Sequence, residues 1–298
     1  MTEALEARIA QRLSAPVVPE VREFAERLGA NANAVAVLFY GSNLRTGLLE
    51  GVLDYYVLLP GPPEKGIWPR VSYHEWESSG TPLRAKVATM TLDTFRAAAA
   101  GELVDTTIWA RFVQPSALAW QRDANALALV AEALCAATRT AARLAVVLGP
   151  SSGREDDYWT ALFQATYSAE FRVEKSGRER DILDRNAPHF DGLLPLALTS
   201  AGIAFDNDQG ILRPHVPETE KTRVRQWWRK RRRLGKPLNL LRLVKASTTF
   251  EGAARYAAWK IERHTGVPVK LTPWRERHPV LAAPGVLFSV WRARRRAD

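Results

Sequence analysis

The chain has 298 residues, of which 46% are hydrophobic and 25% are charged, a composition typical of a folded globular protein and not of a disordered one. A single cysteine, Cys135, excludes an internal disulfide and any cysteine-rich zinc site. The formal net charge is +10, but residues 221–250 contain eleven Lys or Arg and no acid, so the rest of the chain carries a net charge of −1.

The first 120 residues predict helices followed by a strand-rich region. Two helices are expected, over residues 3–13 and 19–28. Apolar runs predict three strands, near 34–40, 52–59 and 84–91. Gly and Pro at 61–63 predict a loop that contains Trp68, Tyr73, His74 and Trp76. Three more helices are expected, over 94–100, 107–112 and 116–120.

The rest of the chain is expected to be mainly helical. The alanine-rich stretch 124–149 is interrupted by three charged residues, so it predicts a buried helix and not a membrane span. Cys135 lies in this stretch, where a buried structural thiol is expected. A linker is expected near 206–217, and further helices are expected over 156–173, from 180 onward, and over 250–265 with Gly266 as its cap.

The motif with the most direct chemical meaning lies between the first two predicted strands. The first apolar run ends in Gly41-Ser42, and Asp54 stands near the start of the second. Gly41 would let a ligand approach the backbone closely, and Ser42 would offer a hydroxyl and a backbone N–H to phosphate oxygens. Asp54 would hold Mg²⁺ against the same phosphates. This arrangement is typical of a nucleotidyltransferase.

The same residues also fit a purely structural interpretation, in which an ordinary turn joins two buried strands and Asp54 is a surface charge. Many nucleotidyltransferases carry two carboxylates at positions i and i+2 of the second strand, on one face of the sheet. Here the second position is Tyr56. A second metal ligand therefore has to come from elsewhere in the chain.

The basic segment 221–250 is the second prominent feature. Its tryptophan pair is followed at once by five cations: Trp227, Trp228, Arg229, Lys230, Arg231, Arg232 and Arg233. Tryptophans beside cations are typical of a membrane interface, where the rings lie at headgroup level and the cations meet anionic lipid. They also suit nucleic-acid binding with aromatic stacking, whereas a solvated charge run explains the arginines but not the tryptophans. We favour membrane binding.

Four sequence blocks between residues 35 and 265 carry a family resemblance. They are 39–42 with 53–57, 86–87 with 109–115, 166–174, and 245–252 with 256–260. Their order is similar to that in the mitochondrial-type CTP:phosphatidate cytidylyltransferases, the translocator assembly and maintenance family. That family also has a single Asp on its second strand, and it has Asp where this chain has Glu170.

The resemblance implies a site assembled from several segments. Asp54 and Glu170 would be the catalytic carboxylates and the Mg²⁺ ligands. Nucleotide and phosphate contacts would come from Gly41, Ser42, Arg172, Lys245, Ser247 and Lys260, since cations and hydroxyls suit phosphate oxygens. Lys245, Ser247 and Lys260 could instead belong to a solvated basic helix face with no role in binding. Glu170 and Arg172 could likewise be a pair of solvated charges.

We therefore predict an α+β protein, with a nucleotidyltransferase-like mixed sheet at 1–122, a helical domain at 123–210 and a basic region at 211–298. The expected reaction joins CTP and phosphatidic acid to give CDP-diacylglycerol and pyrophosphate at an anionic membrane surface. The expected location is cytoplasmic and peripheral to the inner membrane, since the acidic, amphipathic start of the chain is unlike a secretory signal. Two alternatives stay open: a nucleotidyltransferase acting on a small molecule or tRNA, and a non-catalytic nucleic-acid-binding protein.

Overall fold

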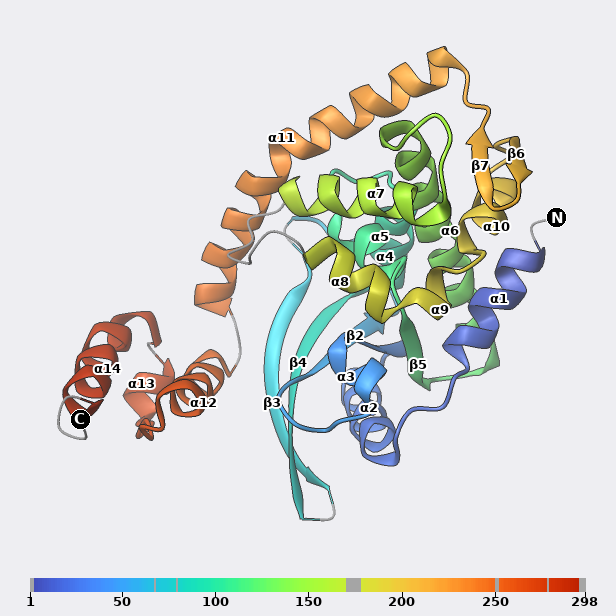
Figure 1. The fold of residues 1–298 in the computed structure, drawn as a ribbon. Coiled ribbons are helices and arrows are strands. Elements are labelled where there is room, and N and C mark those ends of the chain that lie inside the picture. Colours follow the sequence, from blue (N-terminus) through green and yellow to red (C-terminus); the bar gives the residue numbers. More distant parts are fainter. Residues whose placement is uncertain are drawn as a thin grey trace.

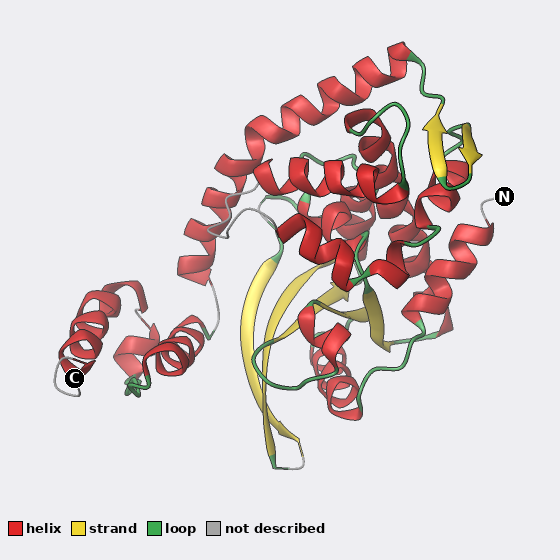
Figure 2. Ribbon diagram, viewed as in Figure 1, coloured by secondary structure: helices red, strands yellow, loops and turns green. Residues whose placement is uncertain are grey.

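The fold is built around one five-stranded mixed sheet (Figures 1 and 2). The computed structural model describes residues 3–66, 68–78, 80–169, 178–249, 252–277 and 279–294. The strands are β1 (Ala36–Tyr40), β2 (Leu53–Leu59), β3 (Arg70–Ser78), β4 (Thr81–Thr91) and β5 (Ser116–Gln121). They lie in the order β3-β4-β2-β1-β5, with β2 and β4 parallel and the other neighbouring pairs antiparallel. The expected α+β class is confirmed.

The strands expected near 34–40, 52–59 and 84–91 are confirmed as β1, β2 and β4. The expected loop around Tyr73 is wrong, because the residues from Arg70 onward form β3 and pair with β4 along their whole length. The expected helix over 116–120 is also wrong, because these residues form β5 and pair with β1. Five residues are too few to distinguish the hydrophobic period of a helix from that of a strand. The segment becomes a strand because β1 offers it an edge with which to pair.

Helices cover both faces of the sheet. On one face lies α2 (Pro19–Asn31), whose Phe24 ring centroid is 5.7 Å from that of Tyr55 on β2. The other face is covered by three helices, α4 (Leu92–Ala99), α5 (Thr107–Phe112) and α6 (Ala124–Leu148). The predictions of helices at 3–13 and 19–28 are confirmed, the first as α1 (Glu3–Leu13), which packs against α6.

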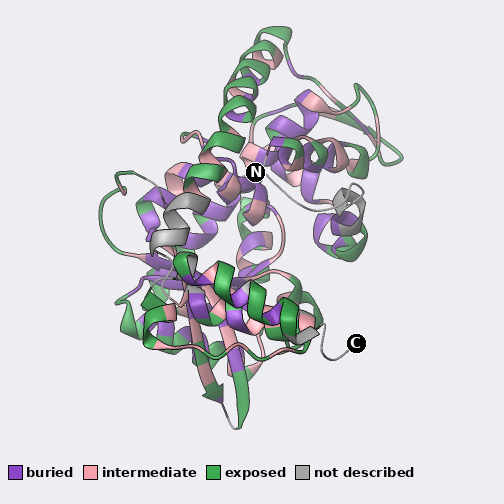
Figure 3. Ribbon diagram, turned by 90° about the vertical axis from the view of Figure 1, so that its left-hand side faces the viewer, coloured by how far each residue is buried: buried purple, intermediate pink, exposed green. Residues whose placement is uncertain are grey.

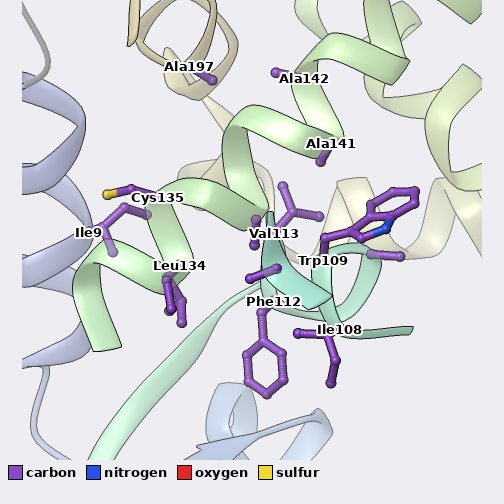
Figure 4. Close-up of a cluster of buried hydrophobic side chains, with 14 of the residues drawn as sticks. Ile9, Ile108, Trp109, Phe112, Val113, Leu134, Cys135, Ala141, Ala142 and Ala197 are labelled. Carbon is purple, nitrogen blue, oxygen red and sulfur yellow. The ribbon is translucent and has the colours of Figure 1, made fainter. Parts of the chain in front are cut away.

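The cluster between α5 and α6 forms the centre of the larger hydrophobic core (Figure 4). Trp109 and Phe112 of α5 and Leu134 and Cys135 of α6 are buried members of this cluster, and Cys135 lies beside Ile9 of α1. Cys135 is buried as expected, and burial raises the pKa of its thiol to about 11. The expected helix over 124–149 is confirmed as α6.

Within the described residues four helices follow α6, and a hairpin leads into the C-terminal part. The helices are α7 (Glu155–Ala169), α8 (Arg178–Arg185), α9 (Ala187–Phe190) and α10 (Leu193–Ser200). The linker expected near 206–217 is instead largely the hairpin of β6 (Phe205–Asp208) and β7 (Ile211–Pro214). It turns through Gln209-Gly210, both at positive φ, a backbone conformation that suits a tight hairpin turn.

The described residues of the C-terminal part form one long helix and three shorter ones. The basic segment lies in α11 (Glu218–Thr249), a 32-residue helix that runs along the edge of the molecule (Figure 1). After it come α12 (Ala253–Thr265), α13 (Pro273–Arg277) and α14 (Pro279–Arg294), and α12 is followed by Gly266 in the left-handed conformation, as expected. No helix within the described ranges combines the length and the apolar character needed to cross a bilayer.

The larger core cluster extends from Leu5 in α1 to Trp228 in α11. It therefore includes side chains from each of the three segments 1–122, 123–210 and 211–298. The division of the chain at these boundaries stays a prediction.

Candidate active site

A row of side chains crosses four strands at one level of the sheet. Asp54 on β2 is the register partner of Tyr40 on β1 and of Lys86 on β4, and Lys86 is in turn the partner of Tyr73 on β3. Directly paired residues on neighbouring strands project to the same face of a sheet. Asp54 therefore lies in the middle of this row, with a lysine on one side and a tyrosine on the other.

The Gly41-Ser42 turn lies directly beside Asp54. Gly41 follows the last residue of β1 and has φ +91°, a conformation that favours glycine, and it precedes the short helix α3 (Ser42–Thr46). A Cβ atom at Gly41 would lie 3.2 Å from Oδ2 of Asp54, so a side chain here would press on the carboxylate. Asn43 fixes the loop that follows, because its Nδ2 donates to the carbonyl oxygens of Leu48 and Glu50 at 2.7 and 2.9 Å.

Arg111, in the last turn of α5, contacts Tyr40, which lies on the opposite side of Asp54 from Lys86. Its Nη1 donates to the hydroxyl of Tyr40 at 3.1 Å, and its guanidinium lies 5.2 Å from the centroid of the Tyr40 ring. Burial raises the pKa of the Asp54 carboxyl, and the positive charges of Lys86 and Arg111 oppose that rise. Burial likewise lowers the pKa of Lys86, and Asp54 opposes that fall. One carboxylate and two cations thus share a half-buried site.

Lys86 and Arg111 were not expected as site residues, although both lie in blocks that carry the family resemblance. The signal that identifies Lys86 is its register with Asp54. That register depends on a parallel pairing between strands separated by β3, and no local sequence pattern specifies it.

Helix α12 places Lys260 near this row. The Tyr256 ring of α12 packs against Tyr73 at 5.4 Å between centroids, and Lys260 lowers the pKa of Lys86 through like-charge repulsion. Lys260 was expected to contact phosphates, and the structure brings its helix to the face of the sheet that carries Asp54.

The other expected phosphate contacts are not described at side-chain level. Glu170 and Arg172 lie outside the described residues. Lys245 and Ser247 belong to helix α11, but their side chains are also outside the described part of the chain. Their expected roles stay predictions.

The basic segment divides into a buried face and an exposed face. Trp228 and Arg231 are each 5% exposed, and Trp227 is half-buried. Both indole rings pack against Trp109 of α5, and Nη2 of Arg231 donates to the carbonyl oxygens of Gly101 and Leu103 at 2.6 and 2.7 Å. The prediction that Trp228 and Arg231 bind a membrane is therefore wrong, because they are buried in contacts that hold α11 to the rest of the protein. Membrane binding by Trp227 stays a prediction.

Four cations of the same run remain exposed: Arg229, Lys230, Arg232 and Arg233. Figure 3 shows exposed residues in green along much of α11. The sequence pattern did not separate the two groups, since a helix that packs through Trp and Arg has the same composition as one that binds lipid.

A second contact ties α11 to the residues just before α5. Arg242 forms an ion pair with Asp105, and its Nε donates to the carbonyl oxygen of Trp68 at 2.9 Å. The side chains of Arg242 and Asp105 are 16% and 3% exposed. The other oxygen of Asp105 accepts the backbone N–H of Thr107 at 2.7 Å, at the start of the helix that ends near Arg111.

The donor set fits a magnesium ion that arrives with a polyphosphate. Within the described ranges no three His, Cys, Asp or Glu side chains gather in one place. Mg²⁺ in nucleotide sites is commonly held by one or two carboxylates while phosphates and waters supply the other oxygens. Asp54 could supply one such oxygen, and the neighbouring cations Lys86 and Arg111 favour an anionic ligand.

Comparison of the sequence with models of known protein families, and with curated proteins, gave no match.

Proposed function

We propose that the chain is a nucleotidyltransferase whose reaction takes place beside Asp54. The observation that carries the proposal is the placement of one carboxylate next to a glycine turn at the end of β1 and between two cations. Gly41 has no side chain to keep a phosphate from the backbone, and Lys86 and Arg111 would offset the charge of that phosphate. Such a transfer needs positioning and charge neutralisation more than covalent catalysis.

In the proposed reaction, an oxygen of an acceptor phosphate attacks the α-phosphorus of a nucleoside triphosphate. A new P–O bond forms there, the bond from the α-phosphorus to the bridging oxygen breaks, and pyrophosphate leaves with the electron pair. Bound Mg²⁺ would neutralise charge on the triphosphate. Asp54 would hold that ion, and Lys86 and Arg111 would orient the phosphates.

The resemblance to the CTP:phosphatidate cytidylyltransferases supports CTP as the donor and phosphatidic acid as the acceptor. The products would be CDP-diacylglycerol and pyrophosphate. The test is incubation of the purified protein with each labelled nucleoside triphosphate, Mg²⁺ and phosphatidic acid. We expect a labelled nucleotide-lipid with CTP. A labelled product with tRNA or a small alcohol instead would replace the acceptor, and no transfer to any acceptor would overturn the proposal.

Helix α14 supports peripheral attachment to a membrane. One face of α14 packs inward through Ala282, Val286 and Val290, whereas Leu281 and Phe288 on the other side are 69% and 61% exposed. A helix that offers exposed apolar side chains beside arginines suits the interface of an anionic bilayer. We propose that α14 inserts apolar side chains and that the exposed cations of α11 add electrostatic attraction.

Replacing Leu281 and Phe288 together by Gln should weaken binding to vesicles that contain phosphatidic acid. Burying such a side chain is worth roughly 1.5–3 kcal/mol, so each replacement should cost about tenfold or more in affinity. The loss should persist at high salt, since apolar burial is not screened. Vesicle flotation at two salt concentrations measures both properties.

A second variant, to be compared with the replacement of Leu281 and Phe288, tests the electrostatic contribution. It neutralises the exposed cations Arg229, Lys230, Arg232 and Arg233 and leaves the buried Arg231 in place. Each cation near an anionic surface contributes roughly 1 kcal/mol, and salt screens that contribution. Its vesicle binding should therefore fall at low salt and differ little from wild type at high salt. Unchanged vesicle binding by this variant, with loss of RNA binding, would favour the nucleic-acid alternative.

A further inference from the structure

Helix α12 lies across the face of the sheet that carries the candidate site. Its first residue follows Gly252, where a Cβ atom would lie 2.6 Å from the carbonyl oxygen of Tyr73. Its Tyr256 ring packs on Tyr73, the register partner of Lys86. Its Trp259 ring lies 5.5 Å from the guanidinium of Arg84. Arg84 and Lys86 are two residues apart on β4 and so project to the same face.

The C-terminal half of α12 continues towards the loop that precedes Asp54. Arg263 lies one turn after Trp259, and its guanidinium is 5.3 Å from the centroid of that ring. Its Nη1 lies 3.3 Å from the position that a Cβ atom of Gly51 would occupy. Lys260 and Arg263 are separated by three residues and are therefore neighbours on the surface of the helix. Both are exposed.

The site thus has an inner and an outer group of cations. Lys86 and Arg111 lie inside with Asp54, and Lys260 and Arg263 lie at the rim on α12. Glu75 on the same face is paired with Arg84 at 3.7 Å, so Asp54 is the carboxylate left to balance these four cations. The region between α12 and the sheet therefore favours a ligand with several negative charges. A polyphosphate carries such charges in a row, and a guanidinium can donate two parallel hydrogen bonds to one phosphate group.

We infer that α12 is the second wall of the site and that Arg263, with Lys260, binds the outer phosphates of a nucleoside triphosphate against the sheet. The inference rests on the proposed function for the identity of the nucleotide. Trp259 holds the Arg263 guanidinium by stacking, and Gly51 leaves space beside it.

Calorimetric titration with inorganic tripolyphosphate, without metal or acceptor, tests this wall directly. Loss of one charge-assisted hydrogen-bonding group should weaken binding by about tenfold or more. We expect that loss for Arg263→Gln and for Lys260→Gln. Arg263→Lys keeps the charge but not the paired donors, so its affinity should lie between those of wild type and Arg263→Gln.

The matched control is Arg255→Gln, which removes one positive charge from the same helix. Arg255 is exposed and pairs with Glu276 of α13 at 3.0 Å. Its replacement should change tripolyphosphate affinity by less than twofold. The inference is overturned if wild type does not bind tripolyphosphate, or if Arg263→Gln binds it as tightly as Arg255→Gln does.

The same titration separates this inference from the proposed function. Tripolyphosphate has no base and undergoes no nucleotidyl transfer, so an Arg263-dependent affinity supports the α12 wall even if no nucleotide-lipid forms. Formation of that product by wild type, with tripolyphosphate affinity independent of Arg263, overturns only the α12 wall.

Discussion

Asp54→Asn should abolish nucleotidyl transfer while the fold is retained. The substitution keeps the shape of the side chain and removes the charge proposed to hold Mg²⁺ against the triphosphate. Loss of one electrostatic contact to a transition state typically costs about 100- to 1,000-fold in rate, and loss of the metal should cost at least as much. Transfer assays with circular dichroism as a check on folding measure the effect.

The pH profile provides an independent check on Asp54. Burial raises the pKa of its carboxyl, and the residue must be charged to hold a metal. Activity should therefore fall as the pH is lowered through this raised pKa, at a higher pH than an ordinary aspartate would give.

The control for Asp54→Asn is Asp208→Asn, which neutralises an exposed carboxylate of the hairpin and should retain the wild-type rate. Near wild-type turnover by Asp54→Asn would exclude Asp54 as a metal ligand.

Arg242→Met should strongly destabilise the protein. The substitution leaves the buried Asp105 carboxylate without its guanidinium partner and removes the hydrogen bond to the Trp68 carbonyl. Removing one member of a buried ion pair typically costs about 3–5 kcal/mol in the free energy of unfolding. Urea unfolding followed by circular dichroism measures the loss, and an unchanged m-value would show that the unfolded state is unaffected.

A double-mutant cycle tests whether the pair itself is responsible. Asp105→Asn keeps the oxygen that accepts the Thr107 N–H, so the start of α5 should stay capped while the charge is lost. The double variant with Arg242→Met should be less destabilised than the sum of the two single variants. Arg232→Met, on the exposed side of the same helix, should change stability little. A loss for Arg242→Met no larger than that for Arg232→Met would contradict the prediction.

Local sequence patterns predicted most of the helices and the strands that carry the site. The periodic apolar residues of α6 and the continuous apolar runs of β1 and β2 each specify one structure over their own length. The polar and aromatic residues of β3, and the six residues of β5, do not. They become strands because β4 and β1 offer them unpaired backbone groups, which is a property of the assembled sheet.

The candidate site shows the same division. The Gly41-Ser42 turn and Asp54 lie within fourteen residues of each other, so their proximity follows from two adjacent strands and could be predicted. Lys86 joins them through the parallel register of β2 and β4, and Arg111 joins them through the position of the short helix α5. Neither the register nor the helix position can be recognised from the nearby sequence.

What the sequence determined by itself was the set of helices and strands with strong periodicity, the turn that brings Gly41 beside Asp54, and the concentration of positive charge in 221–250. Only the tertiary structure decided which of those charges are exposed, that Trp228 and Arg231 are buried against α5, and that α12 reaches the sheet near Lys86. The physical reason is the distance along the sequence over which each kind of interaction acts. Helical periodicity and turn chemistry act between residues a few positions apart, whereas burial and charge balance depend on partners more than one hundred residues away.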